Sequence, residues 1–357
     1  MKQLRKRAPS IPKLPWNPRA VLALALLAVP VLAPSLTGAA PAPAGRPAAR
    51  SSAASAARKD PGGHLPGIYP SRPIFERPFP AQEVPRGIRS LSARECGRCH
   101  ADTYREWQQS VHAQAWPDPQ FQAELRKQPG VSWLCVNCHT PLVNQLDSVV
   151  VSLAGNDVER PIKRANPLFD PGLKPEGVTC AACHVRDGYI EGPSAASTAP
   201  HPTRFNPIFR DASLCTRCHE AVQSYPGKNF ICTFQTGQEW LQGPYGQSGK
   251  PCQDCHMPEV VRSAAPGAPK RRGAHHSWIG SHLRKGFETD LALWEKLAAM
   301  RPVGTRLDAG PAPRGAAGSV ASWKVQVVNA RAGHRLPTGD PECQLSPESS
   351  HPCSRHR

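Results

Sequence analysis

One short pattern occurs five times in this chain of 357 residues and constrains the fold more than any other feature. In each copy two cysteines are separated by two residues, and a histidine directly follows the second cysteine. Successive copies begin 39, 45, 35 and 37 residues apart, so the five sites must lie close together. The copies are Cys96–His100, Cys135–His139, Cys180–His184, Cys215–His219 and Cys252–His256.

Two common explanations of paired cysteines account for only part of this pattern. Disulfides are frequent in exported chains, but they give no reason for a histidine after the second cysteine. A zinc ribbon brings two cysteine pairs into one tetrahedral site, where a histidine adjacent to its cysteine is too constrained to bind comfortably. C-x-x-C-H is instead the attachment signature of c-type haem.

Haem attachment assigns a role to each position of the pattern. The two thiols form thioethers with the porphyrin, and the histidine binds the iron as proximal ligand. We therefore predict five covalently attached haem c groups, with iron. The attachment residues are Cys96, Cys99, Cys135, Cys138, Cys180, Cys183, Cys215, Cys218, Cys252 and Cys255, and the proximal ligands are His100, His139, His184, His219 and His256.

The N-terminus predicts export. A basic segment precedes an apolar run of 14 residues, Ala20 to Ala33, and small residues follow it. We interpret residues 1–39 as a cleaved signal peptide, which places the chain in the periplasm, where haem of this type is attached. A membrane anchor is the alternative, although a spanning helix needs roughly 20 apolar residues.

The composition leaves little material for a side-chain core. Only 39% of the residues are hydrophobic, and the chain contains 41 prolines and 28 glycines. Residues 40–90 are rich in Ala, Pro, Gly, Ser and Arg without periodicity, so we predict a disordered tether there. We expect the porphyrins to replace much of the apolar core in residues 91–301.

The positive charge is explained by the same cofactor. Six basic residues and no acidic residue lie in the predicted signal, so the net charge of +17 falls to +11 in the mature chain. Ten ionised propionates would bring that charge close to neutral. We therefore expect the basic residues to act as counter-ions, and no nucleic acid as partner.

Most second axial ligands must be histidines. After removal of the signal only Met257 and Met300 remain, and Met257 directly follows His256, so it cannot reach the far face of the same haem. Bis-histidine iron also has a lower potential than Met/His iron. His275 competes with its neighbour for one position. The candidate distal ligands are His112, His201, His276, His282 and His334.

Three segments show secondary-structure periodicity. An apolar stripe at helical spacing, in TYREWQQSVHA, lies beside His112. The run from Phe287 to Met300 predicts a packing helix that ends before Pro302. Residues 322–330 alternate as in a β-strand.

The runs CGRCHADTYREWQQSVHAQA, CVNCHTPL, EGVTCAACHVRDG, EWLQGPYGQSGKPCQDCHMP and AGHRLPTGDPE resemble bacterial multihaem cytochromes of the cytochrome c-552/4 type. The resemblance covers about residues 91–342. It implies a mainly α, loop-rich haem-packing fold and electron transfer, with His112 and His334 as distal ligands. It also implies that residues 302–342 begin a β-rich domain, which we expect to be truncated before an atypical tail at residues 343–357.

These observations predict a periplasmic pentahaem cytochrome that relays electrons between redox proteins of a periplasmic or membrane-bound respiratory chain. Membrane attachment is expected only if the signal remains uncleaved. The alternative is an oxidoreductase that acts on a small nitrogen or sulfur compound at one five-coordinate haem. Nitrite reductases of similar layout typically carry one C-x-x-C-K site, which this chain lacks, so we favour the carrier and leave catalysis open.

Overall fold

The computed structural model describes residues 65–339, apart from residues 197, 226–230, 281–283, 302, 312–313, 315–319, 321 and 323. All of the described residues belong to one unit of the chain, Lys59–Arg357. The predicted signal peptide, His282 and the tail at 343–357 lie outside the described residues. In the part that is described, no helix has the length and apolar character needed to cross a membrane.

The fold is mixed α/β, so the prediction of a mainly α fold was wrong. Helices take up about 34% and strands about 18% of the structure, and the described residues form ten α-helices and five small sheets. The strands are only two to six residues long. Some strands are mostly exposed to solvent, such as Pro161–Ala165 and Lys270–Ala274. Such strands bury few side chains, and their alternation of apolar and polar residues is correspondingly weak.

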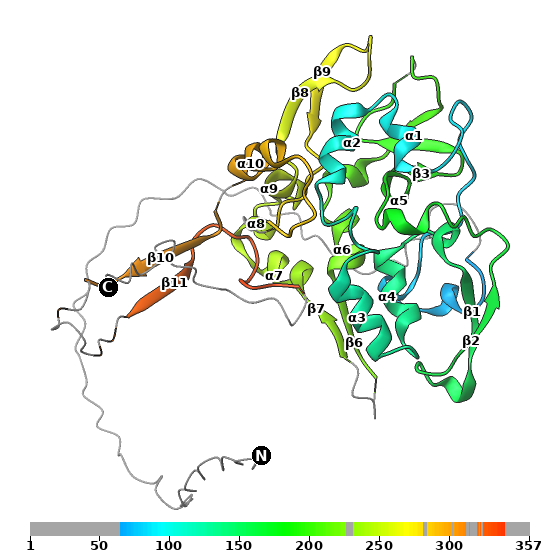
Figure 1. Cartoon of the computed structure of the whole chain (residues 1–357), viewed down its shortest axis with the longest axis horizontal. Coiled ribbons are helices and arrows are strands. Elements are labelled where there is room, and N and C mark those ends of the chain that lie inside the picture. Colours follow the sequence, from blue (N-terminus) through cyan, green and yellow to red (C-terminus); the bar gives the residue numbers. More distant parts are fainter. Residues whose placement is uncertain are drawn as a thin grey trace, which may run out of the picture. The chain divides into compact units, whose positions relative to one another are not determined.

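The helices are short and separated by loops (Figure 1). They are α1 (Ala93–Gly97), α2 (Ala101–Gln108), α3 (Pro119–Lys127), α4 (Ser132–His139), α5 (Cys180–His184), α6 (Ser213–His219), α7 (Thr236–Gln242), α8 (Pro244–Gln247), α9 (Gln253–His256) and α10 (Leu291–Met300). Helix α10 confirms the helix predicted near the C-terminus. It begins after Asp290, whose side chain accepts a hydrogen bond from the Leu293 amide at 3.0 Å.

The strands form small sheets between the later motifs and after the fifth motif. They are β1 (Ser148–Leu153), β2 (Pro161–Ala165), β3 (Val185–Arg186), β4 (Tyr189–Gly192), β5 (Thr203–Phe205), β6 (Ala221–Ser224), β7 (Ile231–Phe234), β8 (Glu259–Ser263), β9 (Lys270–Ala274), β10 (Thr305–Ala309) and β11 (Val325–Asn329). All neighbouring strands pair antiparallel except β4 and β5, which are parallel. Strand β11 confirms the strand predicted at 322–330 and pairs with β10.

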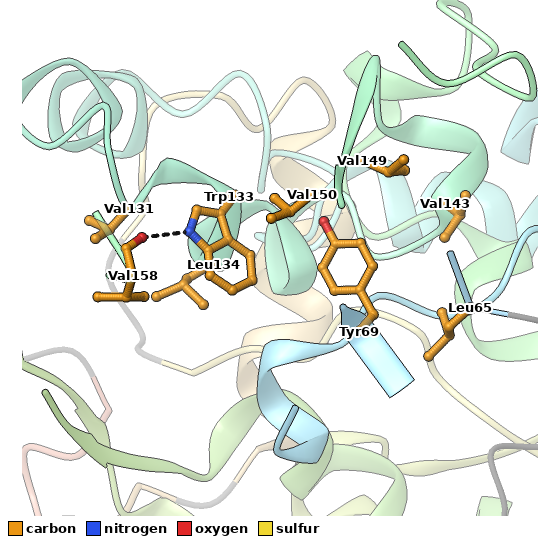
Figure 2. Packing of buried hydrophobic residues seen from close by; sticks show 9 residues of the cluster. All are labelled: Leu65, Tyr69, Val131, Trp133, Leu134, Val143, Val149, Val150 and Val158. Atoms are coloured by element: carbon orange, nitrogen blue, oxygen red, sulfur yellow. Dashed lines mark hydrogen bonds between the residues drawn. The ribbon is translucent and has the colours of Figure 1, made fainter. Parts of the chain in front are cut away.

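A hydrophobic cluster supports the helix of the second motif (Figure 2). Tyr69 is only 1% exposed and lies 6.1 Å from the ring of Trp133 in α4, measured between ring centroids. The Trp133 indole donates a hydrogen bond to the Val158 carbonyl at 3.0 Å (Figure 2). Leu65 belongs to the same cluster. Residues 65–90 therefore include packed structure, and the predicted tether does not extend to residue 90, because these apolar side chains find a partner in α4.

Tyr69 makes the stability of this cluster sensitive to alkaline pH. Burial raises the pKa of Tyr69 to about 12, against the opposing effect of a hydrogen bond to the Val150 backbone. Because the folded chain holds the phenol proton more tightly, the stability contributed by Tyr69 is present below about pH 10 and is lost as pH rises to about 12. In denaturant titrations, Tyr69→Phe should lose less stability across this window than the wild type. The matched control Tyr189→Phe changes an exposed phenol and should follow the wild-type curve, whereas parallel curves for Tyr69→Phe would contradict the assignment.

Candidate functional site

Each of the five motifs lies in or beside a single helical turn. The amide of His100 donates a hydrogen bond to the Cys96 carbonyl at 2.9 Å, and that of His256 to the Cys252 carbonyl at 3.0 Å. Helices α4, α5, α6 and α9 end at their motif histidine, whereas the first motif spans the break between α1 and α2. Residues three and four apart are neighbours on a helical turn, so each turn presents its two thiols and its imidazole together.

The five turns enclose one continuous cavity of about 2460 Å³. All ten motif cysteines line this cavity. So do the five motif histidines and His112, His201, His276 and His334. A pocket for one small ligand has a volume of roughly 300–1,000 Å³, so this cavity has room for several ligands. Thiols and imidazoles are the groups that covalent haem attachment requires, so the residues present fit c-type haem.

Four imidazole pairs face each other across the cavity. The distances between ring centroids are 6.3 Å for His100 and His201, 6.2 Å for His112 and His219, 6.1 Å for His184 and His276, and 6.2 Å for His256 and His334. A metal–nitrogen bond of about 2.0 Å on each side, plus half a ring width at each end, separates two axial imidazoles by about 6 Å. The four pairs therefore have the spacing of bis-histidine sites.

Backbone carbonyls orient most of these rings. A ring N–H that is donated to a carbonyl leaves the other nitrogen free to bind a metal. Nδ1 lies at hydrogen-bonding distance from a carbonyl oxygen in six histidines: His100 (Ala264, 2.7 Å), His139 (Ala115, 2.6 Å), His184 (Glu191, 2.7 Å), His256 (Ile279, 3.3 Å), His276 (Ala274, 2.9 Å) and His334 (Arg335, 2.8 Å).

Burial favours the neutral form of five of these imidazoles. It lowers the pKa of His112 to about 3, and that of His256 and of His276 to about 4. The pKa values of His184 and His219 are lowered for the same reason. A histidine must be neutral to bind a metal, so these rings are in the correct form at neutral pH.

The structure distinguishes His275 from His276, the two adjacent histidines that were alternatives for one distal ligand. The ring of His276 faces His184, whereas the Nδ1 of His275 lies 2.7 Å from the Glu106 carboxylate. His275 is 7% exposed and does not line the cavity. The geometry thus favours His276, while His282, the last of the predicted distal ligands, lies outside the described residues.

The second motif has a distinctive neighbour. The ring of Phe121 in α3 lies parallel to His139, with centroids 3.6 Å apart and planes within 2°. That separation is too short to span a metal, so Phe121 covers one face of the imidazole. Together with the hydrogen bond to Ala115, this stacking fixes the orientation of His139. A phenylalanine in a helical stripe is ordinarily a packing residue, so sequence reasoning missed this contact.

Sequence reasoning also missed Glu106, a buried residue of α2 whose carboxylate contacts the β8–β9 hairpin. Its side chain is 3% exposed and accepts hydrogen bonds from Arg262 and from the His276 amide, each at 2.9 Å. Burial alone would raise the pKa of Glu106, but the hydrogen bonds from Arg262, His276 and His275 lower it below its usual value. One ionised carboxylate thus ties the segment that carries His276 to the helix that precedes His112.

Removal of this charge should destabilise the protein. Glu106→Gln leaves Arg262 partly buried without its counter-ion, which we expect to cost about 3 kcal/mol of unfolding free energy. The matched control on the same hairpin is Glu259→Gln, which breaks an exposed pair with Arg272 and should cost less than about 1 kcal/mol. Denaturant titration of both variants measures the difference, and equal losses would contradict the role of Glu106.

Comparison with known proteins gives a partial family match. Residues 95–162 match the model of the family described as cytochrome c554 and c-prime. The matched segment contains the first two motifs, the end of α1 and the helices α2 to α4. No match was found among curated proteins or among solved structures. The partial match supports a c-type cytochrome of a multihaem family, a class of proteins that carry covalently attached haem and transfer electrons.

Proposed function

We propose that this chain is a periplasmic pentahaem cytochrome that relays electrons between redox proteins. The observation that carries the proposal is the set of four imidazole pairs, 6.1 to 6.3 Å apart, around one cavity lined by all ten motif cysteines. An iron with two protein ligands has no position left for a substrate, so it serves electron transfer and not catalysis.

The residues of the chain have separate tasks in this proposal. Each cysteine pair would anchor one haem, and each motif histidine would provide one ligand to its iron. His201, His276, His112 and His334 would provide the second ligand in the first, third, fourth and fifth motifs respectively. The sequence offers five candidate distal histidines for five haems, and we propose that the fifth candidate, His282, serves the second motif. The haem supplies the one-electron iron couple, while the protein orients it and excludes water.

Contacts between cysteines of different motifs support a closely packed relay. The thiols of Cys96 and Cys180 interact, which lowers the pKa of Cys96 and raises that of Cys180, and this contact joins the first motif to the third. Equivalent contacts join Cys218 to Cys138 and Cys215 to Cys252. The fourth motif therefore touches both the second and the fifth. We assign it the role of a junction in the relay.

The first motif is our candidate for exchange of electrons with a partner. Cys99 is exposed, whereas the other nine motif cysteines are half-buried. Exposed arginines, Arg94 and Arg98, lie on the same turn. We propose other redox proteins as partners, of the periplasm or of a membrane-bound respiratory chain. The predicted signal peptide supports the periplasmic location.

The number of attached haems is directly measurable. Intact mass of the mature, haem-loaded chain should exceed that of the polypeptide by five haem groups. Replacement of both cysteines of one motif, as in Cys252→Ala with Cys255→Ala, should remove one haem and leave four. Cys232→Ala is the control outside the motifs and should retain all five. A wild-type mass with fewer than five haems would contradict the pentahaem assignment.

Binding of carbon monoxide separates the carrier from the oxidoreductase that acts at an open haem. The visible spectrum of the dithionite-reduced protein should not shift with carbon monoxide, because every iron already has two protein ligands. His282→Ala should open one iron and shift about a fifth of the haem absorbance, whereas the control His64→Ala should behave as the wild type. A shift of about a fifth in the wild type would instead favour the oxidoreductase. A larger shift would overturn the four bis-histidine assignments.

A further inference from the structure

Trp278 lies between two of the four imidazole pairs. Its ring meets His112 edge-on, with centroids 4.6 Å apart and an interplanar angle of 71°. It meets His276 in the same manner, at 5.3 Å and 85°. Because His112 faces His219 and His276 faces His184, one indole contacts the distal candidates of the fourth and the third motifs.

The backbone of Trp278 is strained, and the residues on either side hold it in this conformation. Trp278 has a φ of +43°, a region that bulky residues rarely adopt and that costs of order 1–3 kcal/mol. The neighbours Ser277 and Ile279 are buried, and the His275 amide donates a hydrogen bond to the Pro258 carbonyl at 2.9 Å. The His276 amide is held by Glu106. These anchors force the turn that directs the indole between the two imidazoles.

The two distal candidates differ in what else holds them. His276 has its Nδ1 at 2.9 Å from the Ala274 carbonyl. Among the described residues, no hydrogen bond reaches the ring of His112 or that of His219, which faces it. Metal-binding histidines almost always donate their second ring N–H, and that partner fixes the plane of the ring. At His112 the edge of Trp278 is the contact that can restrict the ring in this way.

We propose that Trp278 is a positioning residue shared by two axial ligands, His112 and His276, and that it couples the iron sites of the third and fourth motifs. The proposal rests on the proposed function, in which both histidines bind iron. It explains why a tryptophan occupies a backbone conformation that favours glycine. The orientation of an axial imidazole and the strength of its bond to iron tune the reduction potential of that iron. Loss of the indole should therefore alter the irons of the third and fourth motifs together and leave the other irons unchanged.

The test uses the haem-loaded full chain and two variants. Trp278→Gly removes the ring and suits the positive φ, so the backbone loses its strain. Trp278→Phe keeps an aromatic edge. Electron paramagnetic resonance of the oxidised protein should show that two low-spin ferric signals shift in Trp278→Gly, while the rest keep their g values. A redox titration of Trp278→Gly should show two changed reduction potentials. In Trp278→Phe, both the g values and the potentials should stay close to those of the wild type.

A matched control separates positioning from loss of stability. Trp133→Phe alters a buried tryptophan that contacts none of the paired histidines, and it should lower stability with every low-spin signal intact. Unchanged signals in Trp278→Gly, a change at one site only, or an equal change at all sites would overturn the proposal.

Single ligand replacements test the proposed function separately. His112→Ala and His276→Ala should each convert one haem to a high-spin spectrum. If neither does so, the ligand assignment fails, and the inference about Trp278 fails with it. If both do so while Trp278→Gly leaves the spectrum unchanged, only the inference fails.

Discussion

The structure depends on the opposition of two imidazoles at the spacing that a metal between them requires. The described part of the chain contains four such pairs, and each joins residues more than seventy positions apart, such as His256 and His334. Closing loops of this length costs conformational entropy, which bonds to a metal and contacts with porphyrin faces can offset. Hairpins and short helices then serve to carry histidines to the cavity, which accounts for the small size of the individual elements.

The side-chain clusters lie where they secure these histidines. The cluster of Tyr69 and Trp133 supports α4, which ends at His139. On another side of the cavity, the buried carboxylate of Glu106 holds the His276 segment, with Arg262 as counter-ion. Ion pairs at buried positions are costly when one partner is missing, so such a site maintains a specific arrangement more than it adds stability. Trp278 continues this arrangement from the same segment toward His112.

The proposed relay follows from the contacts between motifs. Cysteines of the first and third motifs touch, as do those of the second and fourth and of the fourth and fifth. Order along the chain therefore differs from order in space. The fourth motif, through Cys215 and Cys218, has neighbours on two sides. Trp278 also contacts His112, the proposed distal ligand of the fourth motif. A change of one ligand at the fourth motif would therefore affect electron transfer through the whole relay most strongly.

The sequence by itself determined the cofactor, because C-x-x-C-H is a local pattern whose chemistry is complete within five residues. It also identified four histidines that the structure places opposite motif histidines, and the helix and strand near the C-terminus. Only the tertiary structure decided which histidine faces which motif, since that depends on loops whose closure has no local signature. The mixed α/β class, the burial of Glu106 and the strained turn at Trp278 were likewise decided there, because each depends on partners distant in the chain.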